Sequence, residues 1–454
     1  MTLRIGNGAG FWGDNLDAPR QLVESSQLDY LTLEYLAELT LSILARLREK
    51  DPNAGYAHDF LPVLKSLVPA LKSQPQLKIV TNAGGMNPAS CARAAAVILR
   101  EAGLGDVRIG VVSGDDLLPR LAELKSAGCE FKNLDDGRPL AELMQPVVSA
   151  NAYLGAQPIA AALADGARIV ITGRVADASL TVGPAMHTFG WSWTDWNKLA
   201  SASVAGHLIE CGAQATGGYS AAWEVTDLAE VGYPIAEFES DGTFIITKPD
   251  GSGGHVTHAT VASQLVYEIG DPRHYLTPDV DCDFTTVELD DLGSNRVAVR
   301  NAAGIAAPES YKVSLAYRDG FMADGRLLVY GSDCIAKANE CARIIAHKLH
   351  AAGYDYARAN VELLGAGDGV PGLYESPVGL REVMLRIAVH DPRREAVERF
   401  CREFAPLATS GPAGLAGYTQ ARGEPRPVFA YWPTLVPRSL ITPQFEVRSA
   451  GDWS

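Results

Sequence analysis

The chain has 454 residues, of which 47% are apolar and 20% charged, a composition typical of a globular protein with two or three domains. A net charge of −15 without a basic stripe argues against nucleic-acid binding, and no apolar run approaches the roughly 18 residues of a membrane-spanning helix. The N-terminal residues lack the basic start and apolar core of a secretory signal, so we expect a cytoplasmic protein with neither nucleic acid nor membrane as a partner.

The first half of the chain alternates short apolar runs with helical patterns. The runs are continuous rather than alternating, as expected for strands of a parallel sheet that helices cover on both faces. This predicts an α/β domain over residues 1–275, with a doubly wound, mainly parallel sheet. The predicted strands are 3–5, 28–33, 78–81, 107–112 and 168–171, and the predicted helices are 34–48, 89–102, 117–126 and 155–165.

The second half has a different pattern, with longer strands and fewer helices. We expect a smaller α+β domain over residues 276–454, with a ferredoxin-like sheet as one option. Before it, a strand at 244–247 and a helix at 256–265 are predicted. Beyond residue 276, the predicted strands are 280–289, 296–300, 311–318, 326–331, 361–365, 382–388 and 427–432, and the predicted helices are 333–352 and 393–404.

Four clusters of glycine and polar residues each follow a predicted strand of the first domain. They are residues 8–14, 82–88, 113–116 and 172–177. In an open α/β sheet the loops at the carboxyl ends of the strands form the ligand crevice. The sequence therefore predicts a small-molecule site on these four loops.

The first loop formally matches a dinucleotide-binding motif, with glycines at 8, 10 and 13 and Glu34 near the distance of a ribose-binding acid. However, Trp12 and Asp14 place bulk and negative charge where a pyrophosphate needs room, so we do not expect NAD as a cofactor. We interpret Gly10, Trp12 and Asp14 as an aromatic-lined, substrate-binding loop.

The second loop pairs two glycines with two asparagines. Gly84 and Gly85 precede a helix start, and such backbone can cradle a carboxylate or phosphate oxygen. Asn82 and Asn87 could orient that group. A glycine turn with an asparagine helix cap is the structural alternative.

The third and fourth loops supply charged side chains. Asp115 and Asp116 could act as a general base and its orienting partner, or bind a divalent cation, with helix capping as the alternative. Arg174 could clamp a carboxylate while Asp177 holds the guanidinium, and a plain ion pair is the alternative. Metal binding therefore stays open.

A further group falls on a predicted helical segment. His207 and Glu210, three residues apart, can share a helix face and serve proton transfer, or hold a metal together with an added acid. Cys211 could be a nucleophile, although a packed thiol is the simpler interpretation. The glycine pair Gly217-Gly218 follows, and we assign it to substrate binding.

Several segments resemble the acyclic terpene utilisation family, the AtuA family, over most of the chain. The resemblance implies a place in the catabolism of branched acids and acyclic terpenes. Some members carry an additional small C-terminal domain or a separate small partner protein, so the resemblance also implies a possible partner subunit. The matching segments include Gly10-Phe11-Trp12-Gly13-Asp14, Asn82-Ala83-Gly84-Gly85-Met86-Asn87-Pro88, Gly114-Asp115-Asp116-Leu117, Gly173-Arg174-Val175-Ala176-Asp177 and Gly206-His207-Leu208-Ile209-Glu210-Cys211-Gly212.

Together these features favour a lyase- or hydratase-type enzyme acting on a small or branched carboxylic acid or its CoA thioester. Arg174 would clamp the acid and Asp115, assisted by Asp116, or Glu210 would move the proton. Asn82 and the adjacent glycine backbone would stabilise an enolate-like oxyanion. The alternative is a non-catalytic acyl-binding or scaffold subunit that works with a small partner protein. We expect a homo-oligomer in either case.

Overall fold

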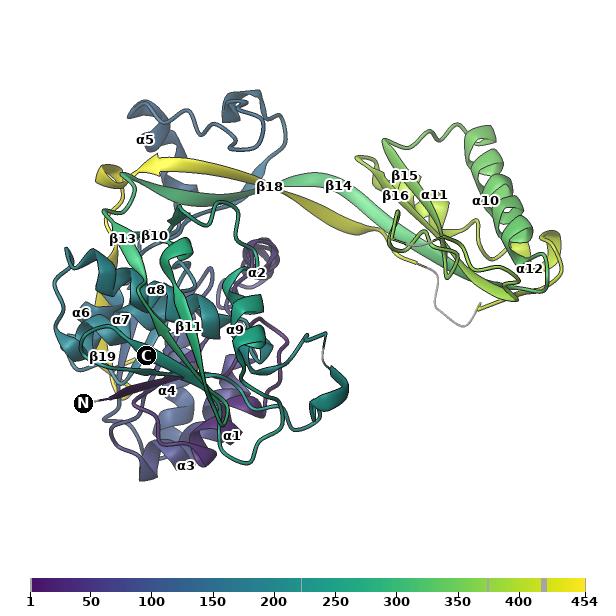
Figure 1. Ribbon diagram of the computed structural model, residues 1–454. Helices are drawn as coiled ribbons and strands as arrows, with labels where there is room; N and C mark the ends of the chain where they lie inside the picture. The colour runs from purple at the N-terminus through teal and green to yellow at the C-terminus, as the bar shows by residue number, and fades with distance from the viewer. Residues whose placement is uncertain (1, 222, 374, 418–422, 454) are drawn as a thin grey trace. The chain divides into compact units, whose positions relative to one another are not determined.

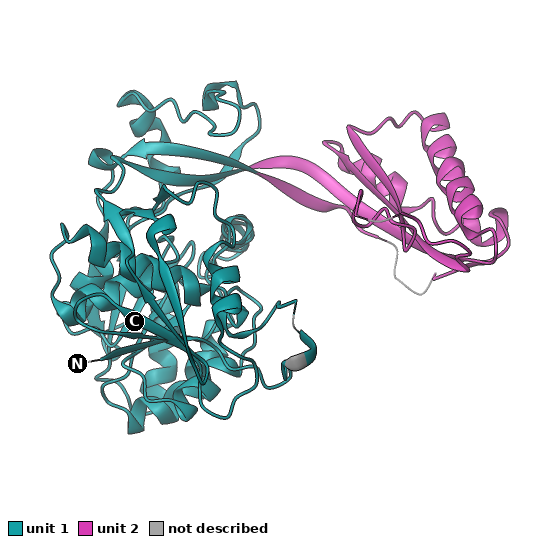
Figure 2. Ribbon diagram, in the orientation of Figure 1, with its two compact units in different colours: residues 1–316, 431–454 teal, residues 317–430 magenta. Residues whose placement is uncertain are grey.

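The computed structural model describes residues 2–221, 223–373, 375–417 and 423–453 (Figure 1). By compactness the chain divides into two units, which Figure 2 colours separately. Unit 1 contains residues 1–316 and 431–454, and unit 2 contains residues 317–430. The predicted domains 1–275 and 276–454 stay a prediction, because compactness alone does not show which segments fold independently.

Unit 1 is built on a mixed sheet with parallel strands at its centre. Strands β1, β2, β3, β6 and β4 run parallel in that order, and antiparallel strands extend both sides. The described strands, in sheet order, are β11 (Glu288–Gly293), β12 (Arg296–Arg300), β8 (Phe244–Thr247), β7 (Ile235–Phe238), β1 (Leu3–Asn7), β2 (Tyr30–Leu33), β3 (Lys78–Thr81), β6 (Ile169–Thr172), β4 (Arg108–Ser113) and β19 (Gln444–Ser449).

Nine described α-helices belong to this unit, and some pack on each other over the sheet. They are α1 (Ala18–Ser25), α2 (Glu38–Lys50), α3 (Phe60–Ser73), α4 (Pro88–Glu101), α5 (Leu121–Ser126), α6 (Gln157–Ala164), α7 (Ser179–Phe189), α8 (Trp196–Glu210) and α9 (His258–Leu265). A small separate sheet contains β13 (Ala303–Ile305), β10 (Asp281–Asp283) and β9 (Tyr275–Leu276).

Helices cover both faces of the parallel strands. On β2, Leu31 and Leu33 lie in a core shared with α1, α3 and α4. The hydroxyl of Tyr30 instead lies 3.1 Å from that of Thr188 on α7. Because successive side chains of a strand point to opposite faces, the two sets of helices lie on opposite sides. The predicted α/β class with a mainly parallel sheet in the N-terminal part is confirmed.

Unit 2 contains an antiparallel sheet with helices packed on it, as predicted in outline for the C-terminal part. The chain order is β14 (Ser310–Tyr330, in this unit from residue 317), α10 (Cys334–Ala351), β15 (Arg358–Leu364), β16 (Glu382–Asp391), α11 (Arg394–Cys401), α12 (Leu407–Ser410), β17 (Leu415–Ala416) and β18 (Arg426–Pro437). The sheet order is β15-β16-β14-β17, and β18 also pairs with β14. Strand β5 (Val147–Ala152) belongs to unit 1 and also pairs with β14, whose residues 310–316 lie in that unit. The ferredoxin-like name stays a prediction.

Three sequence predictions need correction. The strands predicted at 311–318 and 326–331 are one strand, β14, because Gly320 (φ +81°) makes a local irregularity inside the strand instead of a turn. The strand predicted at 280–289 is two strands separated by a short 3-10 turn, which the Asp283 side chain caps. The last strand is not at 427–432, since β19 follows it and pairs with β4.

Candidate functional site

The four predicted loops meet at one edge of the parallel sheet, beyond the carboxyl ends of β1, β3, β4 and β6. A Cβ on Gly84 would lie 2.5 Å from the Thr172 carbonyl oxygen, so only glycine permits this approach of the β3 and β6 loops. The Asp115 carboxylate accepts a hydrogen bond from the Arg174 backbone N–H at 2.9 Å, which joins the β4 and β6 loops.

Asp115 is buried at this edge of the sheet. Its Oδ2 also accepts from the Asn151 amide at 2.8 Å, and a Cβ on Gly173 would lie 2.4 Å from its Oδ1. Burial raises the pKa of Asp115 to about 6, and the neighbouring Asp116 adds to the rise. Asp116 points elsewhere: it pairs with Arg48 at 3.0 Å and accepts from the N–H of Leu118.

Asn82 is also buried, and both ends of its amide are used. Its Oδ1 accepts from the Tyr35 N–H at 2.8 Å, and its Nδ2 donates to Glu34. Glu34 accepts a second bond from the Leu36 N–H at 2.8 Å, while its Oε2 has no partner among the described residues. Burial raises the pKa of Glu34 well above its usual range. We call Glu34, Asn82, Asp115 and Asn151 the buried cluster.

The remaining residues of the second loop shape the turn. Gly85 adopts φ +50°, and its N–H donates to the Asn82 carbonyl at 3.1 Å. Asn87 caps α4 by accepting from the Ser90 N–H at 3.3 Å, and its Nδ2 donates to two carbonyls at 2.9 Å. The helix-cap alternative therefore describes the contacts that Asn87 makes.

Arg174 is the centre of the polar network, with only 2% of its surface exposed. Its Nη1 donates to the Leu36 carbonyl and its Nη2 to Asp177, both at 2.7 Å. The guanidinium carbon lies 4.1 Å from the ring centroid of Tyr153. Because the guanidinium is buried and engaged in this way, its clearest structural effect is to hold Asp177.

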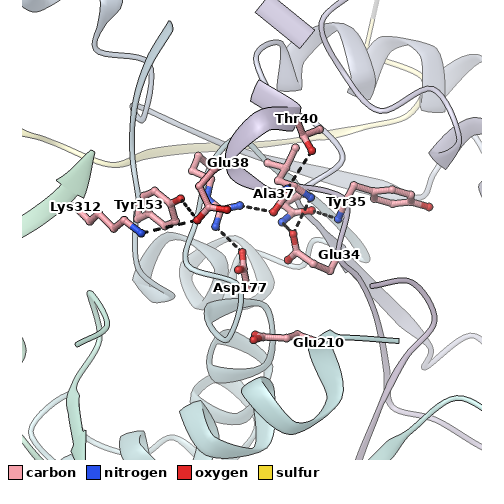
Figure 3. A network of polar contacts seen from close by, with 12 residues as sticks. Glu34, Tyr35, Ala37, Glu38, Thr40, Tyr153, Asp177, Glu210 and Lys312 are labelled. Atoms are coloured by element: carbon pink, nitrogen blue, oxygen red, sulfur yellow. Dashed lines mark hydrogen bonds and ion pairs between the residues drawn. The ribbon is translucent and has the colours of Figure 1, made fainter. Parts of the chain in front are cut away.

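Asp177 lies at the solvent side of Arg174, with 34% of its side chain exposed. Burial raises its pKa to about 7 against the lowering effect of Arg174, and the charges of Glu210 and Glu38 raise it further. In Figure 3 the Glu210 side chain extends toward Asp177. A half-exposed carboxyl group with such a pKa can both accept and donate a proton near neutral pH.

Three residues without a role in the sequence analysis, Glu38, Tyr153 and Lys312, complete this side of the site (Figure 3). The Tyr153 hydroxyl donates to Glu38 Oε1 at 3.1 Å, and the Lys312 ammonium lies 3.8 Å from the same oxygen. Lys312 is 45% exposed. We call Glu38, Asp177, Glu210 and Lys312 the open cluster. Nothing in the residue pattern around Glu38, Tyr153 or Lys312 assigned these residues chemistry.

His207 supports Glu210 from the buried side of α8. Its Nδ1 lies 3.1 Å from Glu210 Oε1, and its Nε2 lies 2.9 Å from the Gln264 carbonyl oxygen. Burial lowers the pKa of His207, but the bond to Glu210 outweighs it and the net shift is upward. Glu210 Oε2 has no partner in the described structure. Burial also raises the pKa of Cys211, which keeps the thiol protonated.

The first loop packs against the end of α8. A Cβ on Gly10 would lie 2.6 Å from the Gly212 nitrogen, so glycine allows this contact. The Asp14 carboxylate turns inward, accepting from the Gly10 N–H at 2.8 Å and the Tyr233 hydroxyl at 2.6 Å. Trp12 packs on apolar side chains of the core. These contacts fix the loop beside Glu210.

The glycine pair at 217–218 makes contacts outside this network. Gly217 has φ +102° and ends a short 3-10 turn, and the Gly218 N–H donates to the Ala213 carbonyl at 2.8 Å. A Cβ on Gly217 would lie 3.2 Å from the backbone nitrogen of His255. These contacts describe a tight turn.

Within the ranges that the structure describes, no three His, Cys, Asp or Glu side chains are grouped as metal ligands. None of the helices there combines the length and apolar composition needed to cross a membrane.

Fold and site together define an α/β protein with an acidic site at the carboxyl edge of its parallel strands. The family model of the acyclic terpene utilisation family protein AtuA matches residues 3–447. The chain therefore belongs to the AtuA family, and this membership implies a role in acyclic terpene utilisation. No curated protein and no solved structure matches it.

Proposed function

We propose that the protein is a catabolic enzyme acting on a small or branched carboxylic acid or its CoA thioester, by lyase- or hydratase-type chemistry. Family membership supports the pathway. The observation that carries the reaction type is the Asp177 carboxyl group, which is 34% exposed, held by the buried Arg174 and close enough to Glu210 for that charge to raise its pKa. Addition or removal of water beside a carbonyl needs a group of this kind to move a proton.

The contacts suggest a division of roles. Asp177 moves the proton, and Glu210, supported by His207, is the second acid or base. Arg174 and Asp115 position the loop that carries Asp177, since both are buried and bonded to protein groups, Arg174 through Nη1 and Nη2. Lys312, as the exposed cation of the open cluster, meets the substrate carboxylate or thioester oxygen in place of Arg174.

The test uses the full-length protein, alone and with candidate small partner proteins. Methyl-branched unsaturated acids and their CoA esters are incubated with it, and mass spectrometry follows the gain or loss of water. Asp177→Asn keeps the size and one hydrogen-bond acceptor but cannot move the proton, so we expect turnover to fall about 100-fold or more. Asp165→Asn, which removes a surface ion pair with Arg108, is the matched control and keeps full turnover.

The outcomes separate the proposal from its alternative. Turnover that depends on Asp177 supports the enzyme. Ligands that raise the melting temperature without any turnover, with or without partners, would instead identify an acyl-binding subunit.

A further inference from the structure

Strand β15 forms an uninterrupted free edge of the unit 2 sheet. It pairs with β16 along its whole length, from Arg358 opposite His390 to Leu364 opposite Met384, and the described residues place no strand on its other side. Proteins usually protect such edges with charged side chains, especially lysine, or with proline or a bulge. β15 has no lysine, proline or bulge and carries two charges of opposite sign, Arg358 and Glu362, whereas the edge strand β11 has a register shift between Asp291 and Gly293.

The backbone of β15 shows which groups point outward. In an antiparallel ladder, alternate residues bond to the neighbouring strand and the others point away from it. The Leu363 N–H donates to Asp368 Oδ2 at 2.8 Å and not to β16, so the odd-numbered residues face outward. Ala359 and Val361 therefore present free N–H and C=O groups within the described structure, and both residues are exposed, Val361 at 46%.

The side chains of the even-numbered residues carry opposite charges on the two sides of Asn360. Arg358, Asn360 and Glu362 share the face of β15 that turns away from the helix-covered core. Within its own chain Arg358, 73% exposed, lies 3.3 Å from Asp319, and Glu362, 20% exposed, lies 3.1 Å from Arg386. An antiparallel pairing of two such strands centred on Asn360 places each Arg358 opposite the other copy's Glu362. These are non-hydrogen-bonded positions, where side chains approach most closely, with Cα atoms about 4.5 Å apart.

We propose that β15 pairs with β15 of a second copy of this chain, antiparallel and with a two-fold axis at Asn360. Ala359 of each copy exchanges both backbone hydrogen bonds with Val361 of the other. Arg358 of each copy lies opposite Glu362 of the other and adds this attraction to the pairs that the two residues make with Asp319 and Arg386 in their own chains. The contact is short, so the dimer dissociates on dilution into the micromolar range.

The backbone part of the proposal is tested by Val361→Pro in the full-length protein. The Val361 N–H faces outward, so proline leaves the ladder with β16 intact but removes a donor from the dimer contact. In sedimentation velocity we expect this variant to be monomeric at concentrations where the unchanged protein is dimeric, with an unchanged melting temperature. The control Val361→Thr keeps the donor and the dimer.

The register is tested by charge reversal and mixing. Arg358→Glu and Glu362→Arg each place like charges opposite each other, and we expect each to weaken the homodimer about tenfold. An equimolar mixture of the two variants restores attraction at both positions, so a heterodimer forms at concentrations where neither variant dimerises alone. Arg343→Glu, an exposed reversal on α10, is the control.

Cysteine cross-linking tests the axis directly. Asn360→Cys places the two thiols opposite each other, so mild oxidation gives a disulfide-linked dimer on a non-reducing gel. Val361→Cys, one residue away and facing Ala359 of the other copy, does not cross-link. The proposal is overturned if the unchanged protein is monomeric up to high concentration. It is equally overturned if the dimer survives Val361→Pro, or if Val447→Cys in β19 cross-links in place of Asn360→Cys.

Discussion

The buried cluster and the open cluster lie at the same edge of the same sheet and share Arg174. The backbone N–H of Arg174 bonds to Asp115 in the buried cluster, and its guanidinium bonds to Asp177 in the open cluster. Burial raises the pKa of both carboxyl groups, to about 6 and about 7. Only Asp177 faces solvent, so a perturbed pKa identifies a chemical role only where a ligand can reach the group.

The largest expected effect tests whether the buried side is rigidly packed. Gly84→Ala pushes a Cβ against the Thr172 carbonyl and the Pro88 backbone, at 2.5 and 2.8 Å. We expect a loss of about 3 kcal/mol in the free energy of unfolding, measured by urea denaturation.

Gly105→Ala is the matched control for that substitution. No heavy atom lies within 4 Å of a Cβ there, and its φ is not positive. Its stability should stay within about 0.5 kcal/mol of the unchanged protein. Equal effects of the two substitutions would show that the loops after β3 and β6 can move apart without a loss of stability. The buried cluster would then not be rigidly packed.

Asp115→Asn tests the buried cluster through pH. The folded pKa of about 6 lies above the ordinary value of 3.8, so the folded state holds its proton more tightly than the unfolded state. The contribution of Asp115 to the free energy of unfolding is fully favourable below about pH 4 and is lost as the pH rises through about 6. At neutral pH this loss is about 3 kcal/mol. In Asp115→Asn this part of the decline in stability between pH 4 and 7 should disappear. An unchanged pH profile would contradict the assignment.

The open cluster should show its pH dependence in the rate instead. If Asp177 removes a proton in the forward direction, kcat/KM rises with pH and levels off above about pH 7. The reverse reaction needs the protonated carboxyl group, so its kcat/KM falls as the pH rises through the same value. Glu38→Gln removes a charge that raises the pKa of Asp177, so the midpoint should move about half a pH unit lower. A midpoint that moves upward would place Asp177 in another role.

The last prediction sharpens the assignment of Lys312. Lys312→Gln removes the exposed cation of the open cluster, and we expect KM to rise about tenfold with kcat within about twofold. The control Lys132→Gln removes an exposed lysine paired with Glu130 and leaves both constants unchanged. A fall in kcat alone would assign Lys312 to the chemical step.

The sequence predicted the frame of the fold because strand signals are local. Continuous apolar runs identified β3 and β8 at the observed bounds, and β6 within one residue. Asp319-Gly320, in contrast, has the local signature of a turn, and only the long-range pairing with β16 extends β14 through it. β19 is short and polar enough to be missed without its partner β4.

The candidate site divides in the same way. The glycine-and-acid loops could be predicted to meet, because parallel strands bring their carboxyl ends to one edge. Burial could not be predicted. The sequence does not show that the amide of Asn82 is hydrogen-bonded to Glu34 and Tyr35, or that Arg174 is buried. Tyr153 and Lys312 join through the pairing of β5 with β14, which no local pattern indicates.

The pairing of β19 with β4 means that the edge of β4 is covered only late in translation. Residues 317–430 leave the ribosome as one continuous segment, before residues 444–449 exist. Until those six residues emerge, β4 has a bare edge whose backbone groups can pair with a foreign chain. A polypeptide that stops before residue 444 would thus present an aggregation-prone strand edge.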